Sequence, residues 1–379
     1  MLKPRRTRAL AALLLAPLLL AAHPTARAYA DATIPVGAGP LLVVAKTHRV
    51  YVSNYADNTV SVIDSSTNAV IATVAVGAGP TALAVDSGTG RVYVANYSDQ
   101  TLSVIDGATN AVVGGPIAVG VTVDAGLTVD PTTHRVYAGD ATGNTIVVVD
   151  GTTDTVLSTP ITVGNTVEGL TLDPTTHDLY AANAGDGTIS VVDTASDMAI
   201  GSPITVGTQP YLSALDQTTH HLYVSNSGSA SVSVIDTTSN TAIGIPIPVG
   251  HAPYGIAIDA GAGNVYVANQ GDNTLSTISE TTNTVTGVRQ TSAQPTGVAV
   301  DPDTGMIYVA DQGANTVQAL TPSQGPGPGP GPNATPELNS STLLLTGLLP
   351  LGLMYLHRRK RRRPTVAGVS SDKGRTLTK

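Results

Sequence analysis

The stretch Arg91-Val92-Tyr93-Val94-Ala95-Asn96 is one copy of a motif that recurs through most of this chain. A tyrosine between small or branched apolar residues stands at seven corresponding places: Tyr51, Tyr93, Tyr137, Tyr180, Tyr223, Tyr266 and Tyr308. Successive tyrosines are 42 to 44 residues apart. A period in the low forties, filled with short β-type runs, is typical of β-propeller blades. The spacing therefore predicts seven blades.

Each repeat divides into four apolar runs separated by turn residues. In the second repeat the runs are 81–85, 91–95, 101–105 and 111–119. The residues between them are mainly Asp, Asn, Gly, Ser and Thr, which favour tight turns. Four short strands joined by tight turns predict one antiparallel sheet per repeat.

The first run of a repeat alternates large apolar residues with small ones. Leu83 and Val85 alternate with Ala82 and Ala84, for example. A sheet packed between two neighbouring sheets needs two apolar faces, and small residues suit an axis where blades converge. This favours an all-β, seven-bladed β-propeller with four antiparallel strands per blade. A β-helix is the alternative, although its rungs usually repeat at shorter periods.

The two ends of the repeat region complement each other. Residues 32–37 match the end of a fourth strand, as at residues 72–77, and they precede the first complete repeat. The last repeat has a third strand, 316–320, but no fourth. We therefore expect the N-terminal strand, residues 33–36, to complete blade seven and close the ring, which removes two open sheet edges.

The recurring Tyr-Val-x-Asn pattern resembles the YVTN family of β-propeller repeats, over roughly residues 32–321. Blades three and seven depart from it, with Asp140 and Asp311 in the Asn position. The resemblance implies a propeller in a secreted or surface-layer protein. The wider superfamily includes lactonase-like enzymes, so the resemblance leaves the activity open.

Composition narrows the choice of propeller and of partner. Cysteine, phenylalanine and tryptophan are absent, which excludes propellers built on tryptophan docking. Residues 31–321 hold 25 acidic and 5 basic residues, a net charge of −20. Such a ring disfavours nucleic acid and anionic surfaces as partners.

The first 30 residues predict a signal peptide. A basic start containing Arg5 and Arg6 precedes the apolar run 9–22, and small residues then offer cleavage after Ala28 or Ala30. We expect general secretion rather than the twin-arginine route, since the match to the latter is weak.

The C-terminal region predicts attachment to a membrane. A Pro/Gly-rich linker, residues 323–340, precedes an anchor over 341–363. We expect its apolar stretch, 343–356, to form a single C-terminal transmembrane helix, which the basic cluster 357–363 follows on the inner side. Pro336-Glu337-Leu338 is similar to a PEP-CTERM sorting signal. Residues 364–379 are expected to form a cytoplasmic or disordered tail. Binding of nucleic acid by the basic cluster is the alternative interpretation.

Candidate chemistry is sparse in the repeats. Histidines recur in the first turn of four repeats, at His48, His134, His177 and His220. Equivalent turns on neighbouring blades lie about 10 Å apart, too far to share one ion, so we expect a turn role. Residues 301–305 resemble the start of a calcium loop but lack the later Glu, and we interpret them as a turn. We predict no metal site, cofactor or catalytic group.

The candidate binding site is defined by position in the repeat. The residue that follows the strand-start position, usually a proline, should lie at the channel mouth. In consecutive blades it is Glu168, Tyr211 and Tyr254, and Asp124 and His251 lie in the same kind of linker. A carboxylate, two phenols and an imidazole could bind a polar ligand or a cation. Sequence drift among loop residues is the alternative explanation.

Two classes of function follow. One is a non-catalytic propeller, anchored at the bacterial membrane or cell surface, that binds an envelope protein or a glycan or has a structural role. The other is a lactonase-like enzyme, or another hydrolase or dehydrogenase, acting at the channel mouth. Small, mainly apolar residues at the mouth and uniform repeats favour the first class.

Overall fold

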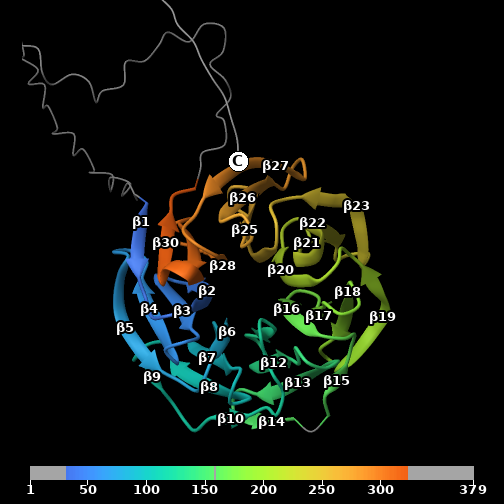
Figure 1. Cartoon of the computed structure of the whole chain (residues 1–379). Coiled ribbons are helices and arrows are strands. Elements are labelled where there is room, and N and C mark those ends of the chain that lie inside the picture. The colour runs from blue at the N-terminus through green and yellow to red at the C-terminus, as the bar shows by residue number, and fades with distance from the viewer. Residues whose placement is uncertain (1–30, 158, 323–379) are drawn as a thin grey trace, which may run out of the picture. The chain divides into compact units, whose positions relative to one another are not determined.

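The structure, a computed structural model, describes residues 31–157 and 159–322. These residues form seven antiparallel sheets arranged as blades around a central axis (Figure 1). The predicted all-β, seven-bladed propeller is confirmed. The signal peptide and the C-terminal anchor predicted from the sequence lie outside the described residues.

Four blades have the simple four-stranded order of an up-and-down sheet. Each runs from the inner strand at the axis to an outer strand at the perimeter. Their strands are as follows: β2 (Pro40–Lys46), β3 (Arg49–Asn54), β4 (Thr59–Asp64) and β5 (Ala69–Ala75) in blade one; β16 (Val167–Asp173), β17 (Asp178–Asn183), β18 (Thr188–Asp193) and β19 (Met198–Thr205) in blade four; β20 (Pro210–Asp216), β21 (His221–Asn226), β22 (Ser231–Asp236) and β23 (Thr241–Pro248) in blade five; β24 (Pro253–Asp259), β25 (Asn264–Asn269), β26 (Thr274–Ser279) and β27 (Thr284–Gln290) in blade six.

Blades two and three differ because their outer strand is broken into two short pieces. In blade two the sequence 111–119 predicts one long run, but the structure has two short strands there, on either side of residues 113–116. Blade two contains β6 (Pro80–Val85), β7 (Arg91–Asn96), β8 (Thr101–Asp106), β9 (Ala111–Val112) and β10 (Ile117–Ala118). Blade three contains β11 (Leu127–Val129), β12 (Arg135–Gly139), β13 (Thr145–Asp150), β14 (Thr155–Val156) and β15 (Ile161–Thr162).

Blade seven is built from both ends of the ring. Its strands are β28 (Pro295–Val300), β29 (Ile307–Asp311), β30 (Thr316–Leu320) and the N-terminal β1 (Ala32–Pro35). Antiparallel pairing places Ala32 opposite Ala319 and Pro35 opposite Thr316. The expected closure by the N-terminal strand is confirmed, and β1 lies beside β30 in Figure 1.

The repeating tyrosines are core residues that also link blades. Six of the seven are at most 1% exposed. The hydroxyl of Tyr180 donates to Asn240 Oδ1 of the next blade at 2.8 Å, and Tyr223 donates likewise to Asn283 at 3.0 Å. In the last blade, Tyr308 donates to Asn68 of blade one at 2.8 Å. At these three positions the tyrosine therefore fills the space between sheets, and its hydroxyl also satisfies a polar group across that space.

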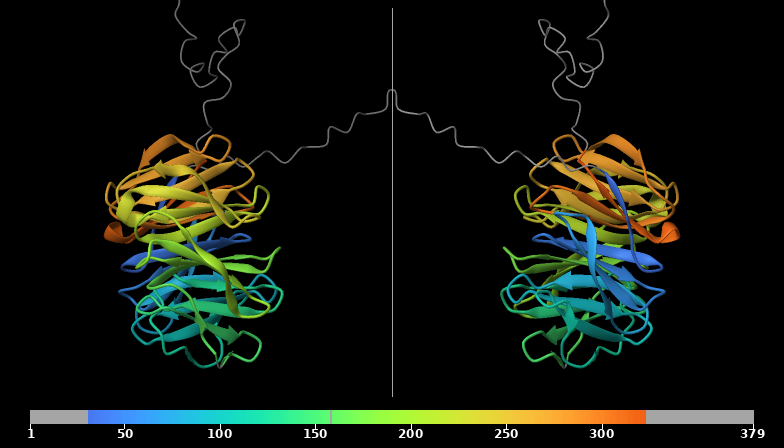
Figure 2. Two further views of the ribbon diagram at one scale, coloured as in Figure 1. Left: turned by 90° about the vertical axis from the view of Figure 1, so that its right-hand side faces the viewer. Right: turned by 90° about the vertical axis from the view of Figure 1, so that its left-hand side faces the viewer.

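Small residues at the axis allow neighbouring backbones to approach closely, as the alternating inner strands predict. A Cβ on Gly169 would lie 2.2 Å from the carbonyl oxygen of Tyr211 in the next blade. A Cβ on Gly255 would lie 2.2 Å from the carbonyl oxygen of Thr296. Only glycine fits at these two positions. Figure 2 shows the blades from the side of the ring.

Candidate functional site

Six of the seven inner strands start with a β-bulge, and three of the candidate site residues, Glu168, Tyr211 and Tyr254, lie in these bulges. In β20 the register shifts between Pro210 and Ser213, so Tyr211 lies in the irregular segment. Glu168 in β16 and Tyr254 in β24 lie in corresponding segments. A bulge turns a side chain away from the regular alternation of a strand.

Other blades use the same position for a structural contact. Thr81 is 1% exposed and donates to the carbonyl oxygen of Val123 in the next blade at 2.8 Å. Thr296 is fully buried and donates to the carbonyl oxygen of Leu41 at 2.6 Å. Glu168, Tyr211 and Tyr254 therefore stand where other blades have a small group that links neighbouring inner strands.

The two tyrosines reach across the channel to blade three. Tyr211 is 9% exposed, and its hydroxyl donates to Asp124 Oδ2 at 2.5 Å. The hydroxyls of Tyr211 and Tyr254 also form a hydrogen bond. Their ring centroids are 3.9 Å apart, with the ring planes tilted by 39°. Leu42 and Val123 belong to the same apolar cluster as Tyr211, against which Tyr254 packs. The two rings thus lie inside the channel rather than at an open rim.

Glu168 completes a carboxyl pair with Asp124. Burial, and to a smaller extent the nearby Asp124, together raise the pKa of Glu168 to about 8. Burial also raises the pKa of Asp124, although hydrogen bonds with Tyr211 and Glu168 oppose this. Neighbouring carboxyl groups oppose each other's ionisation, so the protonation of Asp124 and that of Glu168 are coupled. Glu168 Oε2 is buried and has no hydrogen-bond partner among the described residues.

A cavity of about 330 Å³ lies beside this pair. It separates the linkers of blades four and five, and Glu168 and Tyr211 form part of its wall. Its other lining residues, which sequence reasoning missed, are Thr166, Ala184, Gly185, Gln209 and Ser227. These residue types are common in linkers and loops, so the sequence does not mark them as binding residues. Their only shared feature in the sequence is that they lie in linkers or loops on the same face of the ring as Glu168 and Tyr211.

His251 does not join the other four predicted site residues. Its side chain is 82% exposed, and Nδ1 lies 2.9 Å from Asp272 Oδ1. Its backbone amide donates to Asp272 Oδ2 at 2.7 Å. The same amide-to-aspartate contact joins Ala38 to Asp57 and Ala78 to Asp99. The imidazole therefore extends a repeated loop contact, and the structure brings together Asp124, Glu168, Tyr211 and Tyr254 only.

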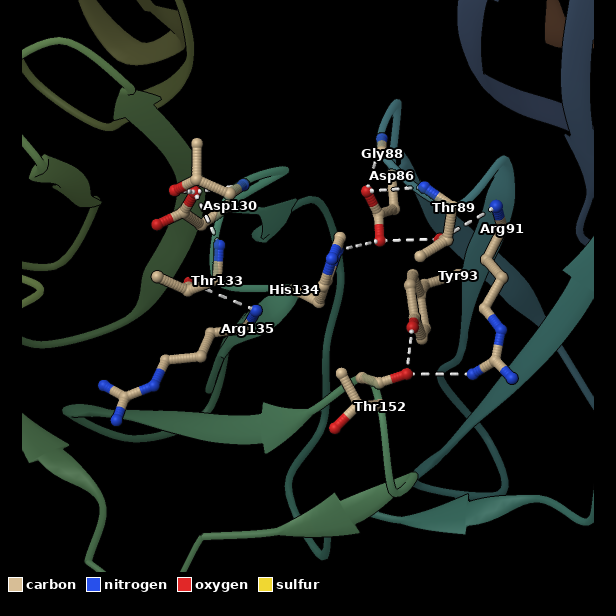
Figure 3. Close-up of polar contacts among 12 residues, drawn as sticks. Asp86, Gly88, Thr89, Arg91, Tyr93, Asp130, Thr133, His134, Arg135 and Thr152 are labelled. Carbon is tan, nitrogen blue, oxygen red and sulfur yellow. Dashed lines mark hydrogen bonds and ion pairs between the residues drawn. The ribbon is translucent and has the colours of Figure 1, made fainter.

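Three of the four turn histidines, His48, His134 and His177, contact an aspartate of the neighbouring blade, as Figure 3 shows for His134. His134 has a φ of +59°, and its Nδ1 lies 2.8 Å from Asp86 Oδ2. His177 approaches Asp130 in the same way, at 3.9 Å. The expected turn role is therefore combined with a contact that the sequence did not reveal. Within residues 31–157 and 159–322, no group of three or more His, Cys, Asp or Glu side chains could hold a metal ion.

Comparisons with known proteins bear on the fold alone. No protein-family model matches the chain, and no curated protein does. Among solved structures, the chain is similar to hydrazine synthase of Kuenenia stuttgartiensis, with a TM-score of 0.65 and 18% identity. The match covers 75% of this chain and 96% of that one.

The chain is thus a seven-bladed β-propeller, the class that its topology defines. As many as 1562 solved chains match it, so this architecture is common and does not select a function. No helix in the part of the chain that the structure describes has the length and apolar character needed to cross a membrane.

Proposed function

We propose that this protein is a non-catalytic binding propeller of the bacterial cell envelope. It takes a small cationic ligand at its channel through Asp124, Glu168, Tyr211 and Tyr254. The observation that carries the proposal is the carboxyl pair of Asp124 and Glu168, because a proton held by two half-buried carboxyl groups can be replaced by a ligand that carries positive charge.

Three further features support a cation. The buried Oε2 of Glu168 lacks a donor, which an ammonium group of the ligand could supply. The tilted pair of tyrosine rings offers aromatic surface for a cation–π contact. The ring carries a net charge of −20 over residues 31–321, which raises the local concentration of cations.

Isothermal titration calorimetry with putrescine and with calcium chloride tests the proposal. We expect the wild type to bind putrescine and Glu168→Gln to bind it at least about tenfold more weakly, since a charged hydrogen bond is lost. The matched control is Glu280→Gln. Glu280 also has a raised pKa, of about 7, but its partner is Asp216 rather than a channel residue.

The outcomes separate the alternatives. Absence of binding to either probe, or an equal loss in Glu280→Gln, would refute the proposed site. Calcium binding that Glu168→Gln abolishes, without putrescine binding, would identify the ligand as a metal cation instead.

The proposed location rests on the sequence. A signal peptide over residues 1–30, an anchor over 341–363 with a PEP-CTERM-like signal, and the resemblance to YVTN repeats together support a secreted protein held at the cell surface. Truncation after Pro322 should release the ring into the medium, as cell fractionation would detect. Retention of the truncated protein in the membrane fraction would contradict the anchor.

A further inference from the structure

Five blades share a buried network at the end of their second strand. In blade one, Asn54 Nδ2 donates to Thr59 Oγ1 at 3.0 Å and to Ser61 Oγ at 2.9 Å. The linker residue Gly37 packs on this amide, so closely that a Cβ on it would lie 2.7 Å from Asn54 Cγ. Asn96, Asn183, Asn226 and Asn269 donate to the third strand in the same way.

Blade seven replaces three members of this network at once. Asp311 stands in the Asn position, Ser292 in the Gly position and Gln318 in the Ser position. Gln318 Nε2 donates to Ser292 Oγ at 3.1 Å. Asp311 is 0% exposed, and neither of its carboxyl oxygens has a hydrogen-bond partner among the described residues. The Oγ1 of Thr316, the next residue across the sheet, is also unpaired.

The position of Asp311 connects it to ring closure. Asp311 pairs with Thr316 in the sheet, and Thr316 pairs on its other side with Pro35 of β1. Next to this pair, the amide of Val36 donates to the carbonyl oxygen of Asn315 at 3.2 Å. The only blade assembled from both ends of the described ring therefore contains a buried, unpaired acid one strand away from its closing strand.

We propose that Asp311 makes the closure of the ring proton-dependent. With Asp311 protonated, β1 stays paired with β30; with Asp311 ionised, β1 detaches more readily. The physical reason is that an ionised carboxylate with no donor beyond the Ser292 hydroxyl is costly in a buried site, and this cost is relieved when water enters. Asparagine, which five of the other six blades have at this position, carries no such charge.

The direction of the pH effect follows from the surroundings of Asp311. Burial raises its pKa to about 7, and a contact with the Ser292 hydroxyl opposes the rise. The side chains that the adjoining segments place beside it are uncharged: Pro295 of β28, Thr316 and Gln318 of β30, Pro35 of β1, Ser292 of the linker and Gln312 of the short helix η2 (Gln312–Ala314).

The charged groups at β1 and β2 lie at the ends of those strands away from Asp311, and Arg289, near the end of β27, is paired with Asp31. Asp31 forms an ion pair with Arg289 and accepts from the amide of Thr321, at the start of β1. Lys46 is the last residue of β2, and the linker joins this strand at its other end, at Pro40. Since the folded pKa of Asp311 is raised, its contribution to closure is full below the unfolded pKa and declines as pH rises toward the folded value.

Hydrogen exchange of the full-length protein, measured by mass spectrometry on the segment that contains β1 and Val36, tests this. After correction for the intrinsic pH dependence of exchange, we expect the opening of this segment to increase roughly 10- to 100-fold from pH 5 to pH 8 in the wild type. Asp311→Asn should remove most of this increase, and Glu280→Gln, a control acid in blade six, should preserve it.

A second variant controls for the possibility that an asparagine at position 311 packs poorly beside Ser292 and Gln318. The triple change Ser292→Gly, Asp311→Asn and Gln318→Ser restores the network of the other blades, and should give pH-independent opening with β1 protected throughout. If either folded variant keeps the wild-type pH dependence, or if the wild type shows none in this segment, the proposal is wrong.

Discussion

Tyr211 donates its phenol hydroxyl to Asp124 Oδ2 at 2.5 Å, and the two residues belong to blades five and three. The bond passes by the inner strand of blade four, where Glu168 contributes the second carboxyl group. A hydrogen bond that joins blades separated by a third blade is possible only near the axis of the ring, where all inner strands converge.

Removing this hydroxyl should destabilise the fold. Tyr211→Phe keeps the ring but deprives the half-buried Asp124 of this donor, which should cost about 1–3 kcal/mol of unfolding free energy. Thermal and urea unfolding measure the change. Tyr55→Phe is the control, since Tyr55 is 38% exposed; equal stabilities of the two variants would show that the bond across the channel contributes little.

Ligand affinity should depend on pH. Because the pKa of Glu168 is about 8, a cation that binds the carboxyl pair at pH 6 must displace the shared proton. We expect the apparent affinity for putrescine to increase up to about tenfold per pH unit between pH 6 and pH 8 and then to level off. Calorimetry at a series of pH values measures this; an unchanged affinity would mean that the pair does not contact the cation.

Closure by β1 should contribute measurably to stability. Ile34 is 4% exposed within the core of blade seven and its neighbours, so Ile34→Ala should cost about 2–4 kcal/mol. Ile71→Ala, on the outer strand β5, removes the same atoms from a side chain that is 43% exposed and should cost under about 1 kcal/mol. Thermal melts of the two variants that coincide would contradict the role of β1.

The inner strands should not tolerate a methyl group at Gly169. A Cβ there would lie 2.2 Å from the Tyr211 carbonyl oxygen, and backbone has little room to move, so Gly169→Ala should cost about 1–3 kcal/mol or more. Gly115→Ala is the control, since a Cβ at Gly115 has no neighbour within 4 Å. Denaturant unfolding compares them, and a Gly169→Ala protein as stable as the control would refute the tight packing.

The contact between Asp86 and His134 should contribute to the free energy of unfolding at near-neutral pH and lose this contribution at acidic pH. Burial opposes ionisation of Asp86, but donors from Thr89, Gly88 and His134 outweigh it and lower its pKa. The stability gained from Asp86 is therefore present above its unfolded pKa and lost as pH falls through the folded value. Asp86→Asn should be about 1–3 kcal/mol less stable at pH 6 and should approach the wild type near pH 2; a gap that is constant with pH would contradict this.

The sequence by itself determined the architecture. Seven tyrosines at a period of 42 to 44 residues predict the number of blades, and the displaced strand at residues 33–36 predicts the closure. These features are readable because every repeat must solve the same local problem: four short strands, tight turns and two apolar faces. Repetition makes the local pattern and the global fold agree.

Only the tertiary structure decided which side chains meet. Asp124 and Tyr211 are 87 residues apart, and His251, three residues from Tyr254, belongs to a different contact with Asp272. The same holds for Asp311, whose departure from the Asn pattern is visible in the sequence but whose burial and place beside the closing strand are not. Bulges, linker turns and the closing of the ring decide where these side chains point. All three depend on contacts between blades, which no single repeat contains.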